Sequence, residues 1–333
     1  MNTHETRSGR HQALVDLSPS TYQPHALHRE PCVWVEKNCY IDVWIELLNA
    51  LRLEPNACMS FTLALDFEGD HWTFFKPPHA ELRTLYGIDV QEMNEWRPLI
   101  EHAAEHLAAG KLISTEADAF WLPDTAGTDY RQQHSKTTIL LNDLDLAHER
   151  LGYFHNAAYF ELEGEDFRQL FGREAVAGAL PLYAELIRID RLQRRPTPEL
   201  ANLSGQLLRQ HLAWRPASNP VLRFAARFNA DLAQLHARGL PHYHAWAFTT
   251  LRQLGAGFEL ASNHLRWLAP HGGADLTSAA ERFDVIAQDC KALILKLARV
   301  VNAKRALDAT EAFAPMAQAW DDGMGLLERA VQA

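Results

Sequence analysis

The sequence changes character near residue 165, and this change limits the folds open to the chain more than any other feature. Beyond it, apolar residues recur at three- and four-residue steps in one segment after another, with Pro or Gly at most joints. The helices expected there cover 165–172, 175–194, 198–213, 220–238, 241–268, 277–302 and 307–331. The second half of the chain is therefore predicted to be all-helical.

Before residue 165 the patterns are mixed. A helix is predicted from Asn38 or Cys39 to Leu51, with Asn38 as its cap. A second helix covers 95–109, and 113–120 fits a helix or a strand equally well. The β-type segments are 60–67 and 71–75, which form a hairpin around the turn at 68–70, and then 134–141 and 151–162. The first half is therefore predicted to be α+β.

A chain of 333 residues is long enough for two domains. Residues 1–28 show little periodicity, so we expect a loosely ordered lead-in there. We place the α+β domain at 29–165 and the helical domain at 166–333.

Composition excludes several classes of function. The formal net charge of -10 disfavours nucleic-acid binding, which depends on Lys and Arg against phosphate. No apolar run is long enough for a membrane-spanning helix, and the N-terminus has no apolar signal segment, so a cytoplasmic protein is expected. The sequence has no phosphate-binding loop and no dinucleotide glycine pattern, so we expect no cofactor.

Cys39 is the strongest candidate for chemistry. It falls in the first turn of a predicted helix, where free N–H groups and the positive end of the helix dipole stabilise a thiolate. The same N–H groups could hold an oxyanion. The alternative interpretation is that Cys39 is one more small side chain in the core.

A cysteine nucleophile needs a base, and the base needs a residue that orients it. His134 begins a predicted strand, and Asn156 lies on the strand that follows. Asp143 and Asp145 are rival candidates for the orienting residue. The order Cys, His, Asn is the one that papain-like folds use.

Three segments carry a resemblance to known proteins. They are the helix start at Asn38 and Cys39, the loop 124–130 that leads to His134, and the segment 154–156. Over about residues 25–330 the chain resembles a bacterial family of unknown function. Over about 30–165 that family is similar to papain-like cysteine enzymes, including the butirosin-biosynthesis type acyltransferases and the peptidase domains of bacteriocin-exporting transporters.

The resemblance implies a papain-like α+β domain with Cys39 as nucleophile, His134 as base and Asn156 as the orienting residue. Asn38 and Asp129 would support the site. The implied reaction moves an aminoacyl group from a carrier-protein thioester to a small-molecule amine. A peptidase or amidase with the same residues, and a non-catalytic module that binds the carrier, are the alternatives.

One position departs from the papain-like pattern. Papain-like peptidases carry a Gln six residues before the Cys as an oxyanion donor, and this chain has Val33 there. The side chain of Asn38 or the N–H of Cys39 would have to replace it. The departure disfavours the peptidase more than the transferase.

The remaining motifs have simpler interpretations. The segment His102-Ala103-Ala104-Glu105-His106 matches an inverted zinc-protease pattern, but both histidines are expected on a solvated helix face, so no metal site is predicted. A loose histidine group is interpreted as core or lid packing and contains His242, His244, His264 and His271. The glycines at 255 and 257 are interpreted as a close packing point.

Four arginines are clustered against the acidic background, on a helix expected to end before Pro196. They are Arg188, Arg191, Arg194 and Arg195. Cations at a helix C-terminus are a sufficient explanation, and a docking patch for an acidic carrier protein is the functional alternative. Lys296, Arg299, Lys304 and Arg305 form a second, weaker candidate for docking.

Overall fold

The computed structural model describes residues 9–172, 182–272 and 276–332. The chain forms two compact units, and each is built from several stretches of sequence. The sheet unit contains Met1–Ala26, Asn38–Leu53 and Leu82–Arg194, and the helical unit contains Leu27–Lys37, Glu54–Glu81 and Arg195–Ala333. The protein therefore has an N-terminal mixed sheet domain and a C-terminal all-helical region, as the sequence predicts.

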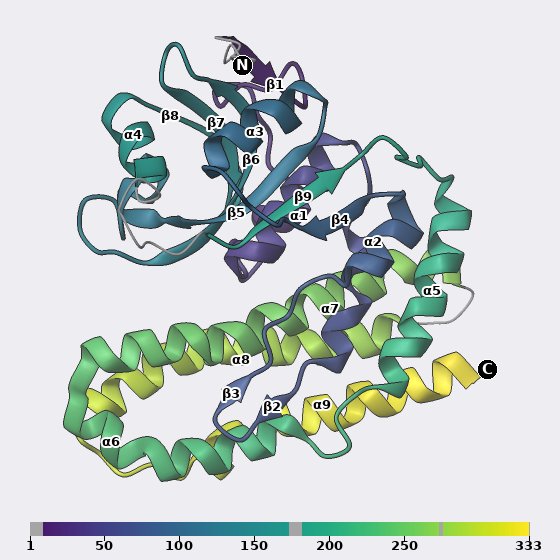
Figure 1. Ribbon diagram of the computed structural model, residues 1–333. Helices are drawn as coiled ribbons and strands as arrows, with labels where there is room; N and C mark the ends of the chain where they lie inside the picture. The colour runs from purple at the N-terminus through teal and green to yellow at the C-terminus, as the bar shows by residue number, and fades with distance from the viewer. Residues whose placement is uncertain (1–8, 173–181, 273–275, 333) are drawn as a thin grey trace. The chain divides into compact units, whose positions relative to one another are not determined.

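The sheet unit is built on one antiparallel sheet (Figure 1). Its strands follow the order β4-β9-β5-β6-β7-β8, and β1 pairs with the end of β6. The strands are β1 (Arg10–Gln12), β4 (Asp89–Glu92), β5 (Leu112–Asp118), β6 (Lys136–Asp145), β7 (Arg150–His155), β8 (Ala158–Glu163) and β9 (Ala184–Arg188).

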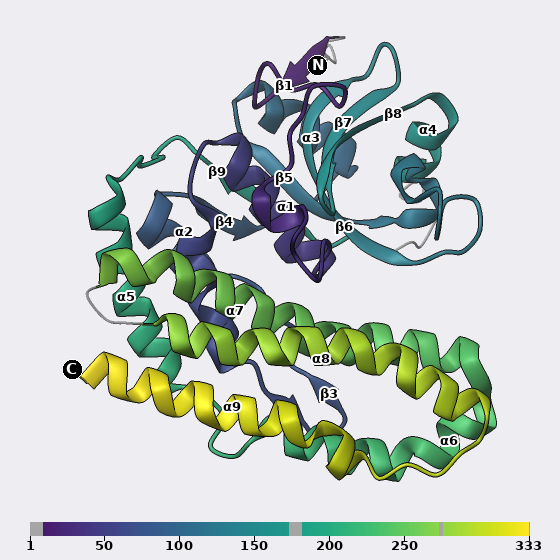
Figure 2. The ribbon, with the colours of Figure 1, turned by 180° about the vertical axis from the view of Figure 1, so that it is seen from behind.

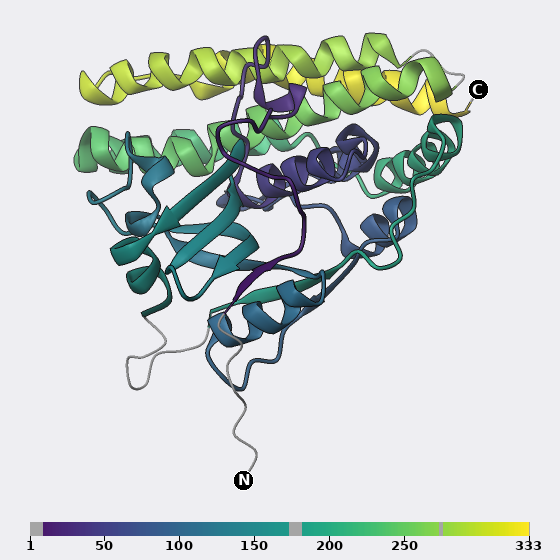
Figure 3. The same cartoon turned by 90° about the horizontal axis from the view of Figure 1, so that it is seen from above.

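Helices cover both faces of this sheet, as Figure 3 shows. Helix α1 (Cys39–Ala50) packs on β6 and β7 from one side. Helices α3 (Leu99–Ala108) and α4 (Gly164–Gly172) share a hydrophobic core with the other side. Successive residues of a strand point to opposite faces, so each strand supplies side chains to both layers.

Several elements of the sheet unit differ from the sequence-based expectation. The ambiguous segment 113–120 is strand β5 as far as Asp118 and then enters a short 3-10 helix, and 151–162 is a hairpin of two strands rather than one. The helix expected over 175–194 is wrong where the structure describes it, because 184–188 is strand β9 between β4 and β5; residues 173–181 lie outside the described part. Residues 10–12, within the expected lead-in, form β1.

The helical unit contains five long or medium helices in its described residues (Figure 2). They are α5 (Thr197–Ala213), α6 (Pro220–Thr249), α7 (Leu251–Gly272), α8 (Thr277–Asn302) and α9 (Ala309–Gln332). Helix α7 lies beside α8, and α8 lies beside α9. Helix α6 is kinked at Gly239, which has a non-helical φ of 75° and lies two residues before Pro241. No helix in the described part is long and apolar enough to cross a membrane.

The helical unit also contains residues 54–81. The predicted strand at 60–67 is wrong, because Pro55–Ala64 forms a 3-10 helix (η2) with Pro55 in its first turn. The predicted turn is present between β2 (Phe67–Glu68) and β3 (His71–Trp72). The close packing of α7 is confirmed, since a Cβ atom on Gly255 would lie 2.7 Å from the Trp34 ring.

Helix α2 (His79–Tyr86) precedes β4 and is followed directly by Gly87, which has a φ of 70°. Its last turn is joined to the chain beyond β9, because the N–H of Gln193 donates to the carbonyl of Tyr86 at 2.8 Å. A Cβ atom on Gly87 would lie 2.1 Å from the Arg191 carbonyl oxygen. Only glycine combines this backbone conformation with this close approach.

Candidate functional site

Cys39 is the first residue of α1, and the predicted Asn38 cap is confirmed. The Oδ1 atom of Asn38 accepts hydrogen bonds from the N–H groups of Tyr40 at 3.1 Å and Ile41 at 2.9 Å. These two donors are already used within the helix start. The Tyr40 and Ile41 N–H groups are thus not available to an oxyanion, which leaves the two donors named from the sequence, the N–H of Cys39 and the side-chain amide of Asn38.

The Cys39 thiol is partly exposed and contacts the sheet. Its Sγ atom donates to Oγ1 of Thr138 on β6 over 3.5 Å. Thr138 is directly opposite Glu116 on β5. Strand alternation puts Thr138, Glu116 and Asp118 on the same face, which is the face that α1 covers.

His134 precedes β6 by two residues and is held by residues from the end of β5. Its Nδ1 atom lies 2.6 Å from Oδ2 of Asp118. Its ring stacks on Phe120 with 4.3 Å between ring centroids and 16° between planes. The side chain remains 68% exposed, so the ring is oriented at one nitrogen and open to solvent around the other.

Cys39 and His134 have different partners, and no hydrogen bond joins them within the described residues. Their partners nevertheless lie on the same face of the sheet. Thr138, the partner of Cys39, pairs with Glu116 on β5, and Asp118, the partner of His134, is the next residue of β5 on that face. Two residues of a strand span about 7 Å. The structure thus places the partners of the thiol and the imidazole at one end of β5 and β6, on one face.

Asn156 lies at the same end of the sheet. It follows the last residue of β7, in the turn before β8, with a φ of 43°. The rival orienting residues are occupied elsewhere: Asp143 forms ion pairs with Arg10 and Arg150, and Asp145 contacts His148 at 2.9 Å.

Asp129 organises the loop that leads to His134. Its carboxylate accepts hydrogen bonds from the Ser135 hydroxyl and, at 3.1 Å, from Nε2 of Gln133. Burial raises the pKa of Asp129, but the hydrogen bonds from Ser135, Thr128 and Gln133 outweigh it, and the net pKa is lowered. An ionised carboxylate cannot donate to an oxyanion, so the supporting role open to Asp129 is structural.

A buried network on the opposite face was not predicted from the sequence. Nδ1 of His155 lies 2.5 Å from Oδ2 of Asp124, and Nε2 lies 2.8 Å from Oγ1 of Thr137. The Tyr153 hydroxyl donates to Oδ1 of Asp124 at 2.5 Å. Burial and the Asp124 charge raise the pKa of Tyr153, which keeps it a donor.

This network ties β6, β7 and the loop before His134 together from behind. His155 is 1% exposed, and Thr137 points away from the face that carries Thr138 because the two residues are adjacent on β6. The spacing of Tyr153 and His155 was the available sequence signal, since residues two apart on a strand share a face.

The predicted arginine cluster is on β9 and the loop after it, so the expected helix is absent there. Arg188 forms an ion pair with Asp89, Arg194 donates to the Leu51 carbonyl, and Arg195 forms an ion pair with Glu199. By contrast, four cations at the end of α8 and beyond are exposed and have no ion pair in the described residues. They are Lys296, Arg299, Lys304 and Arg305.

The expectation that His102 and His106 share a solvated helix face is wrong for His102, which is only 7% exposed. The ring of Trp96 lies edge-on to it, 6.1 Å away between centroids. Burial lowers the pKa of both histidines. No group of three or more potential ligands for a metal ion is present in the described part of the chain.

His264 is completely buried in α7, and its Nδ1 atom lies 2.8 Å from the Asn56 carbonyl oxygen. Burial lowers its pKa to about 4, whereas an unfolded histidine titrates near 6.5. Between these values the unfolded chain binds the additional proton. The contribution of neutral His264 to the free energy of unfolding should therefore be complete above about pH 6.5. It should fall by roughly 3 kcal/mol as the pH drops to about 4.

Urea unfolding at several pH values measures this dependence. In His264→Gln the free energy of unfolding should change by roughly 3 kcal/mol less between about pH 6.5 and about pH 4 than in the parent, whatever the variant's overall stability. His271→Gln, at an exposed position of the same helix, should leave the pH dependence unchanged. An unaltered pH dependence in His264→Gln would contradict the prediction.

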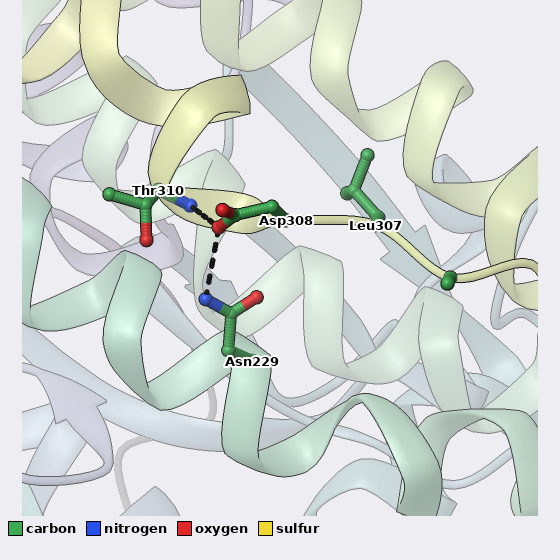
Figure 4. A pocket seen from close by; sticks show the side chains of 5 residues that line it. Asn229, Leu307, Asp308 and Thr310 are labelled. Carbon is green, nitrogen blue, oxygen red and sulfur yellow. Dashed lines mark hydrogen bonds between the residues drawn. The ribbon is translucent and has the colours of Figure 1, made fainter.

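A separate open hollow lies in the helical unit, where α9 begins (Figure 4). Its lining includes Asn229, Leu307, Asp308 and Thr310. The Oδ1 atom of Asp308 accepts from the Thr310 N–H at 2.9 Å and from Nδ2 of Asn229 at 3.5 Å. These groups cap a helix, and they include no nucleophile paired with a base, so the candidate site remains the Cys39 end of the sheet.

The fold and this site define an α+β domain with a partly exposed cysteine at a helix start, followed by a helical domain. Comparison with family models assigns both parts. The DUF1839 N-terminal domain matches residues 23–189, and the DUF1839 C-terminal domain matches 197–329. The chain therefore belongs to the DUF1839 family. A search of curated proteins gives no match.

Proposed function

We propose that the protein is a cysteine-dependent acyltransferase with a papain-like site, which moves an aminoacyl group from a carrier-protein thioester to a small amine. One observation carries the proposal: Thr138, which contacts the Cys39 thiol, and Asp118, which contacts the His134 ring, lie on one sheet face, diagonally across two neighbouring strands, at the end where α1 begins.

In the first half-reaction, Nε2 of His134 takes the proton from the Cys39 thiol, and the thiolate attacks the thioester carbonyl. The carbon–sulfur bond to the donor breaks, and the donor thiol leaves with the proton from His134. In the second half-reaction an amine attacks the acyl-Cys39 carbonyl and gives a proton to His134. The bond to Cys39 breaks, His134 returns the proton to the Cys39 sulfur, and the amide product leaves. The Cys39 N–H would stabilise the oxyanion in both steps.

Intact-mass measurement after mixing with an aminoacyl carrier thioester tests the first half-reaction. We expect a mass increase equal to the acyl group, located on the peptide that contains Cys39 and removed by an added amine. Turnover of peptides or amides without any carrier would identify the protein as a hydrolase instead. An unmodified Cys39 that is alkylated no faster than an ordinary thiol would identify a binding module without catalysis.

The partner in this proposal is an acidic carrier protein. The charges that fit it best are Lys296, Arg299, Lys304 and Arg305, because the described structure gives them no internal ion pair, whereas most of the 188–195 cluster is engaged. Unpaired surface cations act on a charged partner over about a Debye length.

Reversing two of these charges, Lys296→Glu with Arg299→Glu, should raise KM for the carrier substrate about tenfold at low salt and leave KM for a small-molecule thioester unchanged. Arg209→Glu with Arg282→Glu alters the net charge equally at other exposed sites and is the control. Equal effects of both pairs would exclude a specific surface. A larger effect of Arg191→Glu would return docking to the 188–195 cluster.

A further inference from the structure

We propose that Asp118, rather than Asn156, is the residue that positions His134 in this site; the assignment of a reaction to His134 rests on the proposed function. Asp118 is not a catalytic residue in this proposal, because it would touch neither substrate nor sulfur. It acts through the imidazole.

The first argument is contact geometry. The 2.6 Å separation between Oδ2 of Asp118 and Nδ1 of His134 is a short hydrogen bond between side chains that are 16 residues apart. Phe120 stacks on the same ring at 4.3 Å. One contact fixes the direction of the ring edge and the other fixes its plane. An exposed histidine would otherwise sample several rotamers.

The second argument is that Asp118 is itself held in place. Its Oδ1 atom accepts from the N–H of Phe120 at 3.1 Å and caps the short helix η3 (Ala119–Trp121). Its backbone is part of β5, paired with Lys136 of β6. The residue after it donates its N–H to the Ser135 carbonyl at 2.9 Å. Both oxygens of the carboxylate therefore have defined partners, and each partner is distinct.

Asn156 has no comparable connection to the ring. It lies in a tight turn with positive φ, and within the described part of the chain its side chain forms no hydrogen bond to His134. Its neighbour His155 is directed to Asp124 and Thr137 on the opposite face.

The Asp118 contact determines which nitrogen of His134 can act as a base. A carboxylate only accepts hydrogen bonds, so Nδ1 must carry the proton that it donates to Asp118. The neutral ring then has its lone pair on Nε2. This is the tautomer that can take a proton from a thiol.

Asp118→Asn is the discriminating variant. Its amide oxygen can still cap Phe120, and its NH₂ group then faces Nδ1, which must become an acceptor. Neutral His134 would switch to the tautomer with the proton on Nε2. Nitrogen-15 NMR of the ring should show this switch, and kcat for acyl transfer should fall about 100-fold or more, with KM changed much less.

Asp145→Asn is the matched control, because Asp145 contacts Nδ1 of His148 in the same unit. It should alter the His148 ring signals and leave His134 and kcat unchanged. If Asn156→Ala rather than Asp118→Asn switches the His134 tautomer, or if neither does, the inference is overturned. The tautomer is measurable without substrate, so absence of acyl transfer would refute the proposed function while leaving the role of Asp118 testable.

Discussion

Replacing Cys39 by Ser should lower the acyl-transfer rate by at least about 10³-fold and abolish the trapped acyl adduct. A serine hydroxyl is a much weaker acid than a thiol, and the site shows only an exposed imidazole, not a preformed contact, to activate it. Initial rates with a carrier thioester measure the effect. The helix cap at Asn38 does not involve the sulfur, so the fold should survive the change.

Cys32→Ser is the control for this experiment. Cys32 is also a partly exposed cysteine outside any disulfide, and burial raises its pKa, which lowers the fraction of thiolate. Its replacement should leave the transfer rate unchanged within about twofold, an ordinary result for a site away from the chemistry. A Cys39→Ser protein that retained the parent rate would refute covalent catalysis at this position.

Gly87→Ala should destabilise the protein by about 4 kcal/mol, the upper range for single substitutions. Two costs combine there. A φ of 70° is unfavourable for alanine by about 1 kcal/mol, and the new Cβ atom would meet a backbone carbonyl at 2.1 Å. Since backbone cannot move as a side-chain tip does, the junction between α2 and the segment after β9 would have to shift. The midpoint of urea unfolding measures the loss.

Gly110→Ala separates the two costs. Gly110 has a φ of 71° in the same unit, and a Cβ atom there would have nothing within 4 Å. It should therefore show only the conformational cost of about 1 kcal/mol. Equal losses for the two variants would mean that the close approach at Arg191 is relieved without strain.

Features encoded by neighbouring residues were predictable from the sequence. The start of α1 needs only Asn38 and the apolar positions that follow, and the long helices of the second half need only their own periodicity. Strand β9 was not predictable, because a five-residue segment becomes a strand only when β4 and β5 are present to pair with it. The segment 60–67 has the composition of a strand, but most of it belongs to the 3-10 helix η2, which begins at Pro55.

The same distinction applies to the site. Cys39 could be singled out because its position at a helix start is local. The contact between Asp118 and His134 could not, because it depends on the register of β5 against β6, which pairs Asp118 with Lys136. The distance between two residues along the chain does not reveal how their strands are paired. The His155 network depends on the pairing of β6 and β7 in the same way.

The interleaving of the two units has a practical consequence for dissecting the protein. The family models divide the chain between 189 and 197, yet the stretches 27–37 and 54–81 belong to the helical unit. A fragment ending at that division would carry Val33 and Trp34 without the Glu259 carboxylate that accepts their N–H groups, and Ala57 without the hydroxyl of Ser204. Expression of the first part alone would thus leave the N–H groups of Val33 and Trp34 and the carbonyl of Ala57 without these partners, and co-expression of both halves is the sounder route to a split protein.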